Sequence, residues 1–401
     1  MDQQPRQPII GILSDPPARK HHGYHFLGYD MFYKSLCEHA QASGLRCFIT
    51  TLKALDDALR TGMSDLAALG MQGTQSKVQV RGYSWSNEQI EKGIFPLPDL
   101  LYNRLTRRHV EKSPTFNRVL RYLRLFDVIF LHTTYIDKWQ MINVLKKSPA
   151  SFYLPPTEPY TDASLFNLLQ QHGALFIKPA LGSLGRDIFY IRYVRENKTK
   201  SHFALQKSEH PETVHTFWNQ PSLRQWLKKE GPSGSYIMQP DLELVRLDDR
   251  PLDFRVHLVR EQPDRFRVVS TVARLGPVGQ IVTNIARGGK MMPATLALEQ
   301  LKISYPQWAH ALRLKHLQAV AKEIVTAYMR TTDHPDMPLI ELGVDLAVSK
   351  QGVIYLLEIN GKPSKATESS LGNEPRPSTR ALVRAFLHFY RAHTIQKEKE
   401  G

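Results

Sequence analysis

Apolar and polar positions alternate through the first third of the chain in a way that predicts strands and helices in turn. The run PIIGILSD over 8–15 predicts a strand, an amphipathic segment over about 26–42 predicts a helix that stops at Gly44, and LRCFITTL over 45–52 predicts a second strand. Strands that alternate with helices favour a parallel sheet. We therefore expect a small α/β domain that ends near residue 130.

A second apolar pattern, ALFIKPALGSLGRDI over 174–188, predicts a strand ending at Lys178, a loop with Gly182 and Gly185, and a strand beginning near Ile188. Glycines let backbone N–H groups approach a polyphosphate, and a lysine beside the loop adds a positive charge. The loop differs from a Walker A motif, because the lysine precedes the glycines and a strand follows them. A glycine hairpin with a surface lysine is the alternative interpretation.

The later part of the chain contains a polar segment and two helical patterns. Residues 196–235 are rich in Lys, Ser, His and Pro, and we expect a loop there with one short helix around 223–227. Apolar residues recur with helical spacing over about 314–328 and again over 382–390.

Two short apolar runs near the C-terminus, LGVDLAV over 342–348 and VIYLLEIN over 353–360, flank the turn SKQG. If the turn closes as a two-residue hairpin, the last residue of the first run pairs with the first residue of the second, and Asp345 falls opposite Leu356. A register shift of one residue would move Asp345 to the other face.

Three oxygen-bearing side chains share one face of this hairpin in the expected register. They are Asp345, Glu358 and Asn360, with diagonal neighbours roughly 7–8 Å apart. Two carboxylates and an amide oxygen suit Mg²⁺, which leaves its other positions to water and substrate phosphates. The alternative is that Glu358 and Asn360 only mark the point where the strand leaves the core.

Several motifs occur along the chain in an order that resembles the ATP-grasp fold. They are Lys138 at the start of IDKWQMINVL, Lys178 with its glycine loop, Gln239 in YIMQPDLEL, DFR over 253–255, Asn284 in IVTNIARGG, and Asp345 followed by Glu358-x-Asn360. Within that fold the chain is similar to the YheC/YheD family of endospore-associated proteins, and more distantly to RimK-type glutamate ligases. YNRLTRR, YLPPT and LLEINGKPSK also fit, so the resemblance covers most of the chain.

The resemblance implies two α+β lobes that clamp ATP, preceded by a parallel-sheet α/β domain. The domains expected are residues 1–130, a central lobe over 131–239 with the glycine loop, and a C-terminal lobe over 240–401 with the metal site. It also implies ATP and two Mg²⁺ ions as cofactors.

Three groups of site residues follow from the resemblance. The nucleotide would be bound by Lys138, Lys178, Gly182, Ser183, Gly185, Gln239, Asp241 and Leu242; the metal by Asp345, Glu358 and Asn360; and the reacting groups by Arg255, Arg274, Asn284 and Arg287. Lys138 would reach the α-phosphate, and Gln239 with the backbone after it would read the adenine ring. Arginine presents a planar fork that suits a carboxylate or phosphate. Taken singly, each of these arginines and lysines is also consistent with a surface charge.

The function implied is an ATP-dependent carboxylate–amine ligase that makes an amide or peptide bond through an acyl phosphate. Its partners would be ATP, a carboxylate-bearing substrate and an amine, and by analogy with RimK-type ligases an acidic protein or peptide is a candidate. Two alternatives stay open. One is a kinase-like ATP-grasp phosphotransferase, and the other is a spore-structural protein that retains the fold.

Composition indicates a chain with substantial cores and no membrane anchor. The 401 residues are 42% hydrophobic, and Cys37 and Cys47 are too few for a disulfide scaffold. No apolar run reaches the roughly 18 residues of a membrane helix, and the start MDQQPRQP lacks a signal peptide's apolar region. We expect a cytoplasmic protein, with spore association as a variant of that expectation.

The net charge is +15, and the densest basic stretch runs over 104–124. Its basic residues are Arg104, Arg107, Arg108, Lys112, Arg118, Arg121 and Arg124, against the single acid Glu111. An acidic protein or peptide partner, nucleic acid, and a solvated helix face are the three interpretations. Phe116 and Tyr122 form no stacking pattern and no nucleic-acid module is recognisable, so we expect no nucleic-acid binding.

Overall fold

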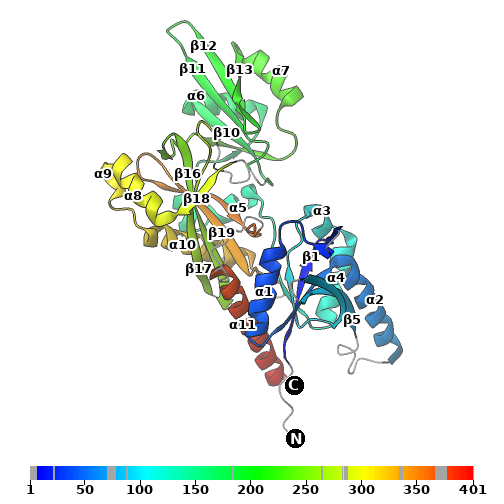
Figure 1. The fold of residues 1–401 in the computed structure, drawn as a ribbon. Helices are drawn as coiled ribbons and strands as arrows, with labels where there is room; N and C mark the ends of the chain where they lie inside the picture. The colour runs from blue at the N-terminus through cyan, green and yellow to red at the C-terminus, as the bar shows by residue number, and fades with distance from the viewer. Residues whose placement is uncertain are drawn as a thin grey trace.

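The computed structural model describes residues 7–20, 23–69, 78–86, 89–182, 185–262, 265–281, 283, 288–333, 337–365 and 377–400. Three large sheets, each with its own helices, organise this part of the chain. In Figure 1 the sheet nearest both termini is the N-terminal one, and the central sheet lies at the far end of the molecule. Within the described residues, no helix is both long and apolar enough to cross a membrane.

The N-terminal sheet has the strand order β6-β5-β4-β1-β7-β8. Its parallel strands are β1 (Ile9–Ser14), β4 (Arg46–Thr51), β7 (Leu100–Asn103) and β8 (Ile129–Leu131), and the antiparallel hairpin β5 (Gln79–Ser86) and β6 (Gln89–Pro96) extends it. The helices are α1 (Asp30–Ala42), α2 (Leu52–Leu69), α3 (Arg108–Glu111) and α4 (Pro114–Leu125), and β2 (Ala18–Lys20) pairs with β3 (Gly23–His25). The parallel sheet is confirmed.

The predicted first helix begins later than expected. Residues 23–25 belong to strand β3, and the carboxylate of Asp30 accepts the backbone N–H of Phe26 at 2.7 Å, so α1 starts at Asp30. Cys37 on α1 is buried and Cys47 on β4 is half-buried, and both thiols are free.

The central sheet is antiparallel, in the order β13-β12-β11-β10-β14-β9. The strands are β9 (Glu158–Pro159), β10 (Ala174–Pro179), β11 (Phe189–Arg195), β12 (Ser201–Lys207), β13 (His210–Phe217) and β14 (Tyr236–Pro240), with α6 (Asp162–His172) and α7 (Gln220–Glu230). The strands flanking the glycine loop are confirmed. The short helix expected around 223–227 is confirmed as α7. The expectation of a loop over the rest of 196–235 is wrong, because Phe203, Ala204 and Leu205 supply enough buried surface for β12 to pair with β11.

The C-terminal sheet has the order β18-β17-β16-β19-β20. Its strands are β16 (Arg250–Gln262), β17 (Arg265–Leu275), β18 (Lys290–Pro293), β19 (Glu341–Val348) and β20 (Ile354–Asn360), and β15 (Arg246–Leu247) pairs with β16. The helices nearby are α5 (Lys138–Leu145), the 3₁₀ turn η2 (Pro149–Tyr153), α8 (Ala294–Ser304), α9 (Pro306–Ala309) and α10 (Leu314–Thr332).

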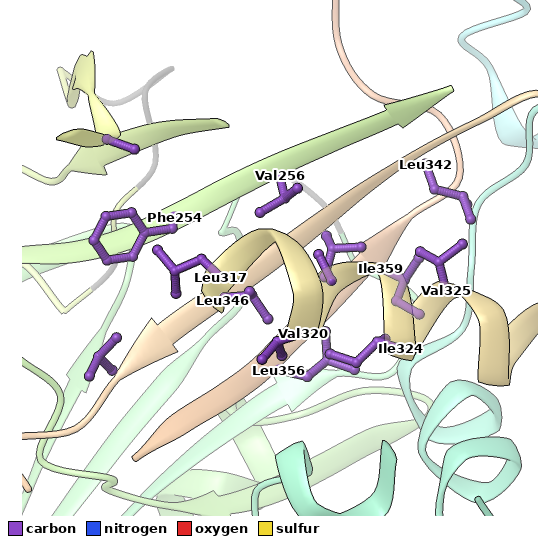
Figure 2. Close-up of a cluster of buried hydrophobic side chains, with 14 of the residues drawn as sticks. Phe254, Val256, Leu317, Val320, Ile324, Val325, Leu342, Leu346, Leu356 and Ile359 are labelled. Carbon is purple, nitrogen blue, oxygen red and sulfur yellow. The ribbon is translucent and has the colours of Figure 1, made fainter. Parts of the chain in front are cut away.

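Helix α10 covers one face of this sheet, as its spacing predicts. Figure 2 shows Leu317, Val320 and Ile324 of α10 packed against apolar residues of β16, β19 and β20. This buried layer holds one face of the β19–β20 hairpin in place, so the polar side chains of its other face are rigidly supported.

Helix α11 (Pro377–Glu400) returns to the N-terminal sheet. Phe386 packs on Tyr102 of β7, and the helix shares a core with Ile10 of β1 and Leu36 of α1. Figure 1 shows α11 alongside α1. The division at residues 130 and 239 stays a prediction, and this shared core links the first and last segments.

The β19–β20 hairpin differs from the expected register. Val348 pairs with Ile354, and the Ser349 N–H donates to the Val353 carbonyl oxygen at 2.9 Å, so the loop is the three residues 350–352. Within it Gly352 has φ +86°, and its N–H donates to the Ser349 carbonyl oxygen at 2.9 Å. This is the turn-plus-bulge loop that a left-handed glycine favours. A second irregularity after Asp345 brings that residue directly opposite Glu358, whereas we expected Leu356 there.

Candidate functional site

The hairpin brings its three predicted metal ligands together. Asp345 pairs with Glu358 across the two strands, and Asn360 lies on the same face. The Asn360 side-chain amide donates to Asp345 Oδ2 at 3.2 Å and to Glu358 Oε1 at 3.0 Å. The bulge after Asp345 is responsible for this convergence, because it changes the register by one residue.

Two arginines converge on the same carboxylate from neighbouring strands. Arg255 of β16 lies opposite Asp345 in the ladder, and its Nη2 donates to Asp345 Oδ2 at 2.7 Å. Arg274 of β17 lies 2.9 Å from that oxygen and also forms a two-bond fork with Asp253, at 2.6 and 2.7 Å. Thr283 donates to Asp253 as well. Both arginines are held by buried acids and are therefore not surface charges.

Lys138 joins the glycine loop to the hairpin. It is the first residue of α5, which is capped by the Asp137 side chain accepting the Gln140 N–H at 2.9 Å. Its Nζ lies 3.0 Å from Glu358 Oε2 and donates to the Gly182 carbonyl oxygen at 3.3 Å. Burial alone would raise the pKa of Glu358, but Lys138 and Arg255 hold that pKa well below its ordinary value.

Lys178 is the last residue but one of β10 and faces the same region from the central sheet. Its Nζ donates to Gln239 Oε1 at 2.9 Å, and the Gln239 Nε2 donates to the Thr157 hydroxyl at 3.0 Å. Burial, and then the positive charge of Lys138, lower the pKa of Lys178 to about 8. The Gln239 side chain thus orients Lys178, and its predicted contact with adenine stays a prediction.

Two aromatic residues beside Lys178 were missed by sequence reasoning. Phe176 and Tyr190 stack with ring centroids 4.6 Å apart, and the Tyr190 hydroxyl donates to Asp241 at 2.6 Å. Phe176 lies two residues before Lys178 on β10, so strand alternation places both on one face. That spacing was the available signal for an apolar wall. The predicted residue Asp241 lies beside this wall through its bond with Tyr190, and the half-buried Leu242 follows it in sequence.

The remaining predicted residues divide into placed and undescribed ones. Gly182 is placed by its carbonyl contact with Lys138, and Gly185 has φ +60°, which a glycine adopts without strain. Ser183, Asn284 and Arg287 lie outside the described residues.

A second polar cluster, which we name the Glu341 network, was also missed. Glu341 opens β19 and is fully buried; it accepts hydrogen bonds from Tyr102, Arg104 and His257 at 2.6, 2.9 and 2.9 Å, and Lys365 Nζ lies 2.8 Å from it. Burial alone would raise the pKa of Glu341, but the cations and hydrogen bonds hold it well below its ordinary value. No signal in the sequence pointed to it, because Glu341 shares its strand with the acid Asp345 and nothing local distinguishes the two.

The basic stretch over 104–124 is not one solvated face. Arg104 is buried in the Glu341 network, and Arg118 forms a two-bond fork with Asp56 of α2 at 2.8 and 2.7 Å. Arg108 donates to the carbonyl oxygen of Leu181, beside the glycine loop, at 2.8 Å. These three side chains join elements of the fold, so an interpretation of the whole stretch as a partner-binding face is too broad.

The oxygen donors of the hairpin fit Mg²⁺. Within the ranges that the structure describes, no three His, Cys, Asp or Glu side chains gather as a metal cage. Two carboxylates and an amide suit a hard cation that takes its other ligands from water and phosphate. Asp345, Glu358 and Asn360 would hold it.

Comparison with known proteins adds sequence relatives. A sequence model of the family described as "YheC/D like ATP-grasp" matches residues 127–391. The endospore coat-associated protein YheD of Bacillus subtilis is 25% identical over 292 residues, 72% of this chain and 61% of YheD. YheC of the same organism is 24% identical over 292 residues, 72% of this chain and 77% of YheC. The match thus spans less than two thirds of YheD.

Solved structures resemble this one along most of its length. The D-Ala:D-Ser ligase VanG from Enterococcus faecalis has a TM-score of 0.52 at 10% identity, covering 96% of this chain and 100% of that one. The D-alanyl-alanine synthetase A from Vibrio cholerae has a TM-score of 0.51 at 10% identity, with 96% and 100% covered. Such likeness shows a shared fold.

Proposed function

Because the chain belongs to the YheC/D-like ATP-grasp family and has the ATP-grasp fold, we propose that it is an ADP-forming carboxylate–amine ligase. One observation carries the proposal. Three acidic or amide ligands, two arginines and Lys138 of helix α5 converge on one face of the β19–β20 hairpin. Lys178 of the central sheet lies near enough for the charges of Lys138 and Glu358 to affect its pKa. All three metal-ligand positions and both lysines are of the type that the reaction requires, which favours an enzyme over a protein that has only kept the fold.

Each group has a task in this reaction. Lys138 and Lys178 bind phosphate oxygens, and the backbone of the glycine loop lies beside them. Asp345, Glu358 and Asn360 hold Mg²⁺, which when bound neutralises charge that develops on the β- and γ-phosphates. Phe176 and Tyr190 form an apolar wall on the central sheet, where adenine would stack.

The arginines serve the acyl group. A carboxylate oxygen of the substrate attacks the γ-phosphorus, the bond to the ADP oxygen breaks, and an acyl phosphate forms. Arg255 and Arg274 bind its anionic oxygens. An amine nitrogen then attacks the acyl carbon, orthophosphate leaves with the bonding electrons, and the amine gives up a proton, so that an amide results.

The substrates are an acid and an amine, and we propose a protein or peptide as one of them. The exposed Arg107, Lys112 and Arg121 would favour an acidic one. Association with spores is proposed on the names of the two Bacillus relatives.

The test is product analysis with a panel of amino acids and peptides. We expect ADP and orthophosphate, and we expect hydroxylamine to trap a hydroxamate in a reaction that needs the acid but no amine. Stoichiometric AMP would contradict the mechanism. A stable phosphorylated product would favour the phosphotransferase, and nucleotide binding without turnover on any substrate would favour the structural protein.

A further inference from the structure

The acidic and basic groups of the site neutralise one another in this structure. Lys138 Nζ lies 3.0 Å from Glu358 Oε2. Asp345 Oδ2 accepts from Arg255 Nη2 at 2.7 Å and lies 2.9 Å from Arg274 Nη2. Each carboxylate assigned to the metal ion is therefore occupied by cations assigned to phosphate or to the acyl group.

The position of Lys138 sets it in competition with a metal ion for Glu358. Its side chain is 13% exposed and its ammonium group lies between the Gly182 carbonyl oxygen and Glu358. A divalent cation at Glu358 would lie next to that ammonium group, in a region where water screens the repulsion poorly. A metal ion alone would have to displace Lys138 and leave it without an anionic partner.

We propose that the metal ion and the nucleotide enter this site together, by an exchange of ion-pair partners. Lys138 moves from Glu358 to a phosphate oxygen of the nucleotide, and Arg255 moves from Asp345 to oxygens of the γ-phosphate that becomes the acyl phosphate. Arg274 stays on Asp345 Oδ2, so the groups released to the metal ion are Glu358 and Asp345 Oδ1. The inference rests on the proposed function, because it takes the nucleotide and metal assignments from it. Each ligand then strengthens the binding of the other by the same factor.

The binding measurement uses Mn²⁺ as the probe for the metal site. Free Mn²⁺ is followed by electron paramagnetic resonance, with and without a non-hydrolysable ATP analogue, and nucleotide binding is followed by calorimetry. We expect the protein to bind Mn²⁺ at least about tenfold more tightly with the analogue present than without it, after the Mn²⁺ bound by free analogue is subtracted. Coupled sites usually show a factor of roughly 5 to 150.

Lys138→Met gives the sharper test, because it moves the two affinities in opposite directions. Without nucleotide, we expect this variant to bind Mn²⁺ about fivefold or more tightly than the wild type, since Glu358 has lost its competing cation. Its nucleotide affinity should fall. Lys147→Met is the matched control, because Lys147 is exposed just beyond α5, and both affinities should stay unchanged. Arg255→Met should likewise bind Mn²⁺ more tightly and the nucleotide more weakly than the wild type, because Asp345 has lost a competing cation.

Two results would overturn the exchange and leave the proposed function standing. They are equal Mn²⁺ affinity with and without the analogue, and weaker Mn²⁺ binding by both Lys138→Met and Arg255→Met. Failure of the wild-type protein to bind the analogue, with or without Mn²⁺, would overturn the exchange and the proposed function together.

Discussion

At the scale of single residues, a side chain's partners decide its chemistry more than its type does. Lys138 and Lys178 are both lysines of the site, yet one pairs with Glu358 and the other is held by the neutral amide of Gln239. Among the residues that the structure describes, none offers Lys178 a carboxylate at hydrogen-bond distance, and burial and Lys138 lower its pKa to about 8. A phosphate would supply the missing anion.

We expect Lys178→Met to fold and to lose about 2 kcal/mol or more of nucleotide binding, roughly thirtyfold. Wild-type affinity should fall as pH rises through about 8, because the free lysine then loses the proton that phosphate binding requires, and Lys178→Met should lack this slope. Calorimetry at several pH values measures both, with the exposed Lys228→Met as control. If Lys178→Met bound the nucleotide as tightly as the wild type, the assignment of Lys178 to phosphate binding would be wrong.

The lowered pKa of Lys178 has the opposite effect on folding. An unfolded lysine titrates near 10.5, above the folded value of about 8, so the unfolded chain binds more protons between these values. Stability therefore rises with pH in that window. Lys178→Met removes this dependence and should be at least as stable as the wild type at pH 7.

At the scale of elements, the β19–β20 hairpin positions the metal ligands through two irregularities. Strand alternation placed Asp345, Glu358 and Asn360 on one face from the sequence alone. It could not place the three-residue loop or the bulge, because both depend on the backbone of Gly352 and on packing under α10. The two shifts together changed which residues pair across the hairpin, but they left the three side chains on the same face.

Glu358→Gln should test the hairpin as a metal site. The substitution keeps the shape of the side chain and removes one anionic ligand. We therefore expect turnover to be lost at the Mg²⁺ concentration that saturates the wild type, and the Mg²⁺ concentration needed for ADP release to rise about tenfold or more. Nucleotide contacts on the central sheet are untouched, and ADP binding should survive in part. An unchanged Mg²⁺ dependence of ADP release would show that the hairpin does not bind the metal.

Gly352→Ala should destabilise the protein more than Gly279→Ala. Both glycines have positive φ, +86° and +72°, where alanine costs about 1–2 kcal/mol. A Cβ at Gly352 would also lie 2.9 Å from the Trp308 ring, whereas a Cβ at Gly279 meets nothing within 4 Å. Overpacking adds about 1–3 kcal/mol. Urea unfolding of both variants measures the difference, and equal losses would contradict this account of the turn.

At the scale of the whole molecule, the Glu341 network joins three regions that are far apart in sequence. Tyr102 and Arg104 come from the N-terminal sheet, His257 and Glu341 from the C-terminal sheet, and Lys365 from the segment after the metal hairpin. No local pattern reveals such a contact, because its members are ordinary polar residues until the chain folds. The sequence placed Arg104 in a basic surface stretch for the same reason.

We expect Glu341→Gln to cost about 3–5 kcal/mol of unfolding free energy, because the buried cations Arg104 and Lys365 would lose the carboxylate that they share. Glu299→Gln is the control, since the Glu299 side chain is 65% exposed and pairs with Lys302 on the same helix. It should change stability by less than about 1 kcal/mol. Similar urea midpoints for the two variants would show that the network does not stabilise the fold.

Helix α11 has a consequence for the order in which the molecule is made. The ribosome releases the N-terminal sheet first, yet Ile10, Leu36 and Tyr102 complete their core only against Phe386 and its neighbours. During synthesis these apolar residues stay open to water until α11 has emerged, which is the interval in which chaperones bind nascent proteins. The N-terminal sheet is thus translated before the other two sheets and finished after them.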